Sequence, residues 1–170
     1  MKKIVIMRHA KSSWDDDSLK DFDRPLNDRG LYDASLLGGF IKRSGQLPDL
    51  IFSSPAKRAR QTATLFCEST SVQNDSVIWT DKFYYGSASD YVDAIRSCDF
   101  KDVETVMLVG HNPLVEQTVR LLCGENQHSL LRMPTAAVVC LEYPADDWKS
   151  ADNIRSRFKW MVTPGILKKI

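Results

Sequence analysis

The chain has 170 residues, of which 43% are hydrophobic and 26% are charged. This length predicts one domain over residues 1–170, large enough to bury its own core without disulfides or structural metals. The 23 basic and 22 acidic side chains nearly cancel, which excludes a disordered acidic chain and a broadly basic surface for nucleic acid. The four cysteines include no C-x-x-C pair, which indicates free thiols.

The apolar runs are too short for a membrane protein. The longest, residues 136–141, is far below the ~20 residues that a membrane helix needs. After Lys2 and Lys3, the apolar run ends at Arg8, before it reaches the ~7 residues that a signal peptide needs. We therefore expect a cytoplasmic protein that binds neither a membrane nor nucleic acid.

Short apolar runs predict the strands. Residues 4–7 are continuously apolar, which is typical of a parallel strand with both faces covered. Similar runs lie at residues 50–52, 105–109, 137–143 and 157–162.

Helical patterns lie between these runs. Residues 31–42 carry apolar side chains on one face, and residues 89–96 predict a shorter helix. Ser54-Pro55 and Asn112-Pro113 each predict the start of a helix, with the polar residue as cap and proline at the first position. The alternation predicts a single-domain three-layer α/β/α fold with a largely parallel central sheet.

Basic and imidazole side chains follow three of the predicted strands. Arg8 and His9 follow residues 4–7, Arg58 lies in the helical turn after residues 50–52, and His111 follows residues 105–109. Any one of them alone could be an ordinary surface residue. Ligands of open α/β sheets bind beyond the carboxyl ends of the strands, and helix N-termini attract anions. Together the four residues predict a phosphate pocket, whereas His128 lies in a polar stretch without this context.

The residue types suit phosphoryl transfer. A neutral imidazole is nucleophilic near pH 7, so His9 would attack phosphorus and form a phosphohistidine that water then hydrolyses. Arg8, Arg58 and His111 would stabilise the phosphoryl oxygens, and we expect neither a metal nor another cofactor. A thiol phosphatase is excluded because no cysteine begins a C-x5-R motif, and a P-loop because no Gly-Lys pair exists.

Four segments resemble motifs of the histidine phosphatase superfamily, also called phosphoglycerate-mutase-like. Arg8-His9-Ala10-Lys11-Ser12 resembles its R-H-G-x-S signature, although alanine replaces the usual glycine. Residues 25–30 (PLNDRG) are similar to P-L-T-x-x-G, and residues 54–63 (SPAKRARQTA) are similar to S-x-x-x-R-A-x-Q-T-A. Residues 109–112 (VGHN) resemble the element with the second histidine. The short chain and the R-H-A-K-S and G-H-N-P segments look most like SixA-type phosphohistidine phosphatases.

The resemblance implies His9 as the nucleophile and Arg8, Arg58 and His111 as phosphate ligands. It also implies supporting phosphate or substrate contacts from Ser12, Asn112 and Lys11. Position 15 is aspartate where many members have asparagine, so Asp15 is left out of the site.

A proton donor is missing from its usual place. Many members that act on phosphate esters carry an acid between the second arginine and the second histidine, but residues 81–86 (DKFYYG) contain no glutamate. A basic alkoxide leaving group needs such an acid, whereas imidazole leaving from phosphohistidine does not. Asp81 and Asp21 remain as weaker candidates for a donor.

The sequence thus predicts a metal-independent phosphatase for phosphohistidine on a phosphorelay or phosphotransfer protein, acting as a monomer. A phosphomonoesterase for a sugar or nucleotide phosphate is the alternative, in which case the partner would be a small phosphorylated substrate. A non-catalytic phosphate-binding module is a third interpretation.

Overall fold

A single twisted sheet organises the protein. The computed structural model describes residues 1–98, 102–124 and 131–170. In these residues, six strands form one sheet in the order β3-β2-β4-β1-β5-β6. Their bounds are β1 Lys2–Arg8, β2 Leu50–Ser53, β3 Val77–Trp79, β4 Thr105–Gly110, β5 Val138–Tyr143 and β6 Arg157–Val162. Strands β3, β2, β4 and β1 run parallel, whereas β5 is antiparallel to both of its neighbours, so the predicted largely parallel sheet is confirmed.

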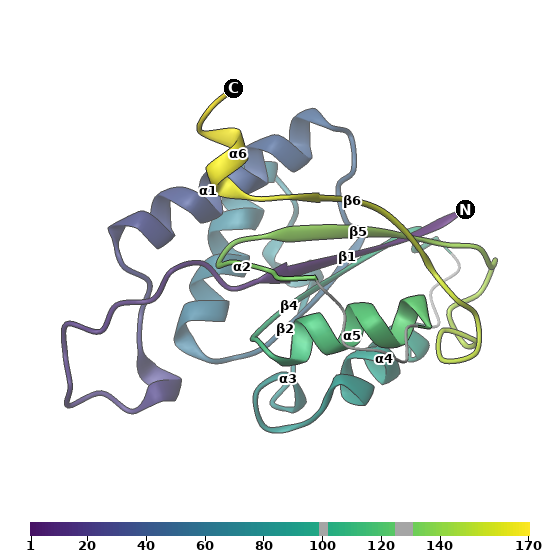
Figure 1. Cartoon of the computed structure of the whole chain (residues 1–170), viewed down its shortest axis with the longest axis horizontal. Helices are drawn as coiled ribbons and strands as arrows, with labels where there is room; N and C mark the ends of the chain where they lie inside the picture. Colours follow the sequence, from purple (N-terminus) through teal and green to yellow (C-terminus); the bar gives the residue numbers. More distant parts are fainter. Residues whose placement is uncertain (99–101, 125–130) are drawn as a thin grey trace.

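Helices cover both faces of this sheet, which confirms the three-layer α/β/α fold (Figure 1). On one face α1, α2 and α6 pack together, and α3, α4 and α5 cover the other. The helices are α1 Asp28–Arg43, α2 Lys57–Thr70, α3 Lys82–Tyr85, α4 Ala88–Arg96, α5 Leu114–Cys123 and α6 Pro164–Leu167. Two short 3₁₀ turns are η1 Asp21–Asp23 and η2 Asn74–Ser76. No helix in the described part of the chain has the length and apolar character to cross a membrane.

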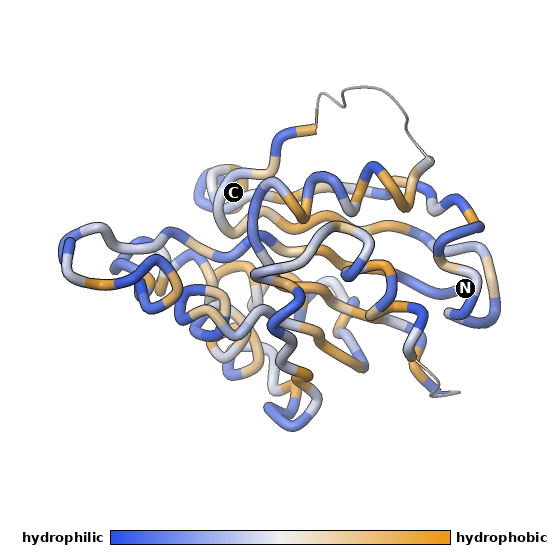
Figure 2. Tube along the Cα trace, turned by 90° about the horizontal axis from the view of Figure 1, so that it is seen from below, coloured by the Kyte–Doolittle hydropathy of each residue, from blue (hydrophilic) through white to orange (hydrophobic). Residues whose placement is uncertain are grey.

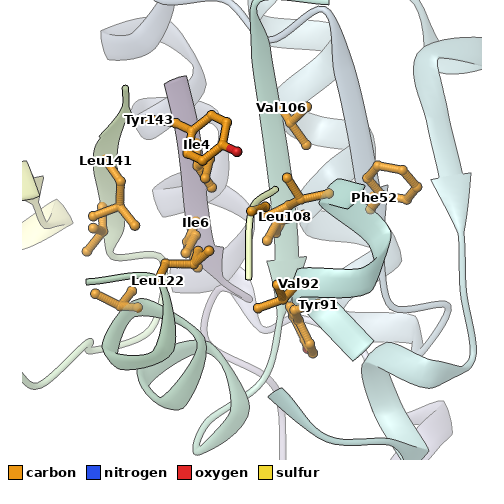
Figure 3. Packing of buried hydrophobic residues seen from close by; sticks show 14 of the residues in the cluster. Ile4, Ile6, Phe52, Tyr91, Val92, Val106, Leu108, Leu122, Leu141 and Tyr143 are labelled. Carbon is orange, nitrogen blue, oxygen red and sulfur yellow. The ribbon is translucent and has the colours of Figure 1, made fainter. Parts of the chain in front are cut away.

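Strand β1 is apolar from Ile4 to Met7 because these residues contribute to a separate core on each face. Ile4 and Ile6 belong to one buried cluster and Val5 and Met7 to the other. Figure 3 shows the first cluster, in which side chains of α4 and α5 pack over the sheet. Along the tube in Figure 2 the strands are mostly hydrophobic, whereas the segment that projects between β1 and α1 is mostly hydrophilic. The central strands of the sheet are therefore buried, whereas most of the chain between β1 and α1 is exposed.

Both predicted helix starts are wrong. Helix α2 begins at Lys57, because Ser54 continues from β2 through a backbone N–H bond of 3.0 Å to the Val109 carbonyl. Helix α5 begins at Leu114, and the side-chain amide of Asn112 donates to neighbouring groups instead of capping it.

The remaining elements differ less from the expectation. Helix α1 begins at Asp28, where Asn27 caps it by accepting a 2.9 Å hydrogen bond from the Gly30 N–H. Strand β3 and helix α3 lie in a region where no clear periodicity predicted them. The thiols of Cys67, Cys98 and Cys140 are free and buried, as expected.

Candidate active site

The sheet brings the segments after β1, β2 and β4 to one edge. Arg8 pairs with Gly110 and Ser53 with Val109 in the parallel register. The backbone N–H of His9 then donates to the Gly110 carbonyl at 2.9 Å. As a result, the rings of His9 and His111 lie with their centroids 5.0 Å apart. The predicted convergence of the strand ends is present.

His9 is held in the tautomer that a nucleophile needs. Its Nδ1 lies 2.7 Å from the Ala10 carbonyl, and because a carbonyl can only accept, Nδ1 carries the proton. The unprotonated Nε2 accepts a 3.3 Å hydrogen bond from Arg58 Nε. Burial, aided by the charges of nearby arginines, lowers the pKa of His9 to about 3, although its bond to Ala10 acts in the opposite direction. His9 is therefore neutral at pH 7, with a lone pair on Nε2.

His111 lies opposite His9 and is also neutral. Its Nε2 is 2.8 Å from Ser54 Oγ, whereas its Nδ1 is buried with no hydrogen-bond partner among the described residues. Burial, and then the neighbouring His9 and Arg58, lower the pKa of His111 to about 3. Glycine is required before it, because a Cβ at position 110 would collide with the buried Tyr91 hydroxyl. The Gly110 backbone therefore packs closely against Tyr91 directly before His111.

Arg58 connects His9 to the loop between β1 and α1. Its place in the first turn of α2 buries the guanidinium, which is only 8% exposed. While Nε faces His9, one terminal nitrogen donates to the Asp21 backbone carbonyl and the other donates to Asp21 Oδ2 at 2.9 Å. All three nitrogens of the guanidinium therefore have acceptors.

Asp21 lies in the middle of an ionic network. Arg24 donates to Oδ1 at 2.9 Å, and the Tyr84 hydroxyl donates to Oδ2 at 2.7 Å. Burial acts to raise the pKa of Asp21, but hydrogen bonds from Tyr84, Arg58 and Arg24 and the charge of Arg58 outweigh it, so the pKa is about 2. An ionised carboxylate cannot donate a proton, so this environment does not favour the predicted donor role. Asp81 is exposed at the start of α3, and its side chain does not cap that helix.

Arg8 is held by the backbone of Met133. One terminal nitrogen donates to the Met133 carbonyl at 2.9 Å, and its Nε is buried with no partner in the described ranges. The Asn112 amide donates to the same carbonyl at 3.2 Å and to Glu116 Oε1 at 2.9 Å. Glu116 Oε1 also accepts a hydrogen bond from the Met133 N–H at 2.8 Å, so this carboxylate holds both Asn112 and Met133.

Ser12 and Lys11 form hydrogen bonds within the segment between β1 and α1. Ser12 Oγ accepts a 2.7 Å hydrogen bond from Arg24, and the Lys11 carbonyl accepts a 3.0 Å bond from the Asn27 N–H. A phosphate contact from either residue stays a prediction.

Comparison with known proteins agrees with this geometry. A sequence model of the histidine phosphatase superfamily (branch 1) matches residues 4–78. An uncharacterised chloroplast protein of Arabidopsis thaliana is 31% identical over 168 residues, which cover 95% of this chain and 75% of that protein. The structure of a candidate phosphohistidine phosphatase SixA from Agrobacterium tumefaciens matches with a TM-score of 0.80 and 30% identity, covering 96% of this chain and 98% of that one.

The chain belongs to the histidine phosphatase superfamily. A second solved structure, of the protein histidine phosphatase SixA complexed with tungstate, has a TM-score of 0.82 at 22% identity and coverages of 97% and 99%, which supports the fold alone. Membership in the superfamily supports a phosphatase activity for this chain.

The arrangement in this histidine phosphatase suits an anion next to His9. Buried nitrogens without partners, Arg8 Nε and His111 Nδ1, lie on residues that flank the nucleophile. Buried polar atoms in native proteins are nearly always hydrogen-bonded, so unpaired ones at a pocket indicate a polar ligand. No group of three or more His, Cys, Asp or Glu in the described ranges is arranged to bind a metal ion. His128 lies outside the described residues.

Four further site residues are missed by sequence reasoning: Ser54, Arg24, Tyr84 and Glu116. Arg24 lies directly before the P-L-N-D-R-G segment, which is the one signal that could have pointed to it. Tyr84 comes from α3, which carries no periodic signal. Its ring packs edge-on against His111 at a centroid distance of 5.4 Å.

Exposed aromatic side chains form a rim around this pocket. Phe22 packs against Tyr84 and Tyr85 with centroid distances of 5.0 and 6.2 Å, and Tyr85 is 72% exposed. Trp14 is 68% exposed, and the Arg24 guanidinium carbon lies 3.2 Å from the centroid of its ring. Exposed aromatic side chains therefore lie next to the ionic network around Asp21.

Proposed function

We propose that the protein is a metal-independent phosphatase that removes the phosphoryl group from phosphohistidine on a phosphorelay or phosphotransfer protein. The observation that carries this proposal is the neutral His9, whose Nε2 faces Arg58 beside the Asp21 carboxylate, which pairs with two arginines. Among the described residues, the site provides a nucleophile and cationic ligands, and the carboxylate beside them is ionised.

The tautomer of His9 supplies the attacking lone pair, and the leaving group of phosphohistidine explains why no acid is needed. Nε2 attacks phosphorus while Nδ1 keeps its proton on the Ala10 carbonyl, so the phosphorylated ring is cationic. The P–N bond to the substrate breaks, and its imidazole leaves with the electron pair as a neutral base if it carries the same proton. Water then attacks phosphorus, the bond to Nε2 breaks, and dihydrogen phosphate and neutral His9 are formed. An alkoxide, by contrast, would leave with a charge that a donor must neutralise.

The remaining site residues would stabilise charge on phosphorus. Arg58 contacts His9, Arg8 precedes it in the chain, and His111 presents a ring nitrogen from the end of the neighbouring strand β4. Fixed donors of this kind stabilise the transferring phosphoryl group electrostatically. We assign the ligand role to these three residues and a supporting role to Asn112, which holds the Met133 carbonyl that binds Arg8.

The aromatic rim supports a substrate carried on a protein. Exposed apolar side chains gathered at a pocket are typical of protein-binding surfaces. Trp14 and Tyr85 are both exposed beside the pocket, and a small phosphate ester would not need contacts with them.

The test is phosphate release from a phosphohistidine-bearing protein and from a phosphate monoester, measured side by side. We expect a strong preference for phosphohistidine and loss of turnover in His9→Ala. Preference for the monoester would contradict the proposal and indicate a small-molecule phosphatase with a donor elsewhere. Binding of tungstate without turnover of either substrate would indicate a phosphate-binding module.

A further inference from the structure

Asp21 contacts Arg58 in a way that fixes the direction of its guanidinium. The backbone carbonyl of Asp21 accepts from one terminal nitrogen of Arg58, and the carboxylate accepts from the other at 2.9 Å. Because a guanidinium is planar and rigid, two fixed terminal nitrogens also fix the direction of Nε–H. That N–H points at His9 Nε2 at 3.3 Å, where phosphorus would be attached.

Asp21 is itself held from the other side. Arg24 donates to Oδ1 at 2.9 Å and is anchored by Ser12 Oγ at 2.7 Å and the Ser13 carbonyl at 3.0 Å. The Tyr84 hydroxyl adds a 2.7 Å bond to Oδ2. Charge-assisted bonds of this kind are shorter and stronger than neutral ones, so together they make the carboxylate a fixed support for Arg58.

The same carboxylate balances charge. Arg8, Arg24 and Arg58 all act on His9, and Asp21 is the acidic side chain that pairs with two of them. A pocket in which Arg24 and Arg58 lacked the Asp21 carboxylate would bind the product phosphate more tightly and release it more slowly.

We propose that Asp21 is a positioning residue that aims Arg58 Nε at His9 and weakens the hold of the pocket on product phosphate. The inference rests on the proposed function, since it assigns Asp21 a role in turnover at the same site. It replaces the proton-donor role that the sequence suggested for Asp21.

The chain offers a matched control for the test. Asp23 lies two residues further in the same 3₁₀ turn and is exposed, and no hydrogen bond or ion pair of its side chain is found in the described part of the protein. Asp21→Asn and Asp23→Asn therefore remove the same charge from the same turn, but only the first removes it from Arg58. Affinity for inorganic phosphate is measured by calorimetry, and turnover with the phosphohistidine-bearing protein.

We expect Asp21→Asn to bind phosphate about three- to tenfold more tightly and to turn over about tenfold more slowly, while Asp23→Asn matches the wild type in both. Phosphate affinity that is unchanged or weaker in Asp21→Asn would overturn the inference, since a purely structural residue or a proton donor would give those results. The binding measurement needs no turnover. It therefore decides the inference even if the wild type proves inactive on phosphohistidine, which would count against the proposed function alone.

Discussion

The two sides of the pocket are built by different physical means. On the strand side, Arg8 is the last residue of β1, His9 follows it and His111 follows β4, so backbone pairing between the two strands places all three. On the loop side, Asp21, Arg24 and Tyr84 come from segments outside the sheet and meet through ionic and hydroxyl hydrogen bonds. Figure 1 shows the projecting segment between β1 and α1 at the end of the sheet. The strand side is therefore fixed by the fold, whereas the loop side is fixed by its own charges.

Loss of Arg58, which joins the two sides, gives the largest expected effect. Arg58→Ala removes the donor that faces His9, and we expect a loss of about 2–4 kcal/mol of transition-state stabilisation. Steady-state kinetics measures this as a fall in kcat/KM. Arg60→Ala is the control. Arg60 lies two residues after Arg58 in α2, is exposed, and stacks on Trp79. Equal activity of the two variants would remove Arg58 from the pocket.

The strand side should also make stability depend on pH. Burial lowers the pKa of both His9 and His111 from 6.5 to about 3, so between these values the unfolded chain binds more protons than the folded one. The free energy of unfolding should therefore fall as the pH falls from about 6.5 toward 3. Denaturant titrations across this range should show a shallower dependence in His111→Asn. An identical slope in the variant would mean that His111 is not buried in its neutral form.

Substitutions of Glu116 and of Asp21 should change the free energy of unfolding by different amounts. Glu116→Ala removes the acceptor of the Met133 N–H and of the Asn112 amide, and we expect the free energy of unfolding to fall by about 1–3 kcal/mol. Gln117→Ala in the same helix is the control. Asp21→Asn should change stability little, because exposed ion pairs contribute about 0–1 kcal/mol, and the Asp21 side chain is 52% exposed. A larger loss for Asp21→Asn than for Glu116→Ala would reverse the comparison.

The smallest expected effect concerns the rim. Tyr85→Ala should lower kcat/KM for a phosphohistidine-bearing protein by about 1 kcal/mol, roughly fivefold, and leave hydrolysis of free phosphohistidine unchanged. Tyr32→Ala is the control, since this exposed tyrosine on α1 packs near Lys168 Nζ instead, at 5.3 Å from its ring. An equal loss on both substrates would mean that Tyr85 acts on the pocket and not on the partner.

The sequence predicts the strand side of the pocket better than the loop side. Continuous apolar runs identify buried strands, and residues directly after them must lie at the end of the sheet, so Arg8, His9 and His111 were predictable. Arg58 was predictable from its position after β2, although the helix begins later than Ser54-Pro55 suggested. Tyr84 and the pairing of Asp21 with Arg58 were not, because no periodicity or turn signal determines how a loop and a short helix meet across a pocket.

The most direct test of the central claim is to trap the intermediate. A phosphohistidine-bearing protein labelled on phosphorus is mixed with the enzyme, the reaction is quenched within milliseconds, and the labelled residue is located by mass spectrometry. We predict acid-labile, base-stable phosphate on His9, absent in His9→Ala. Turnover with phosphate on another residue, or without any covalent intermediate, would contradict the account.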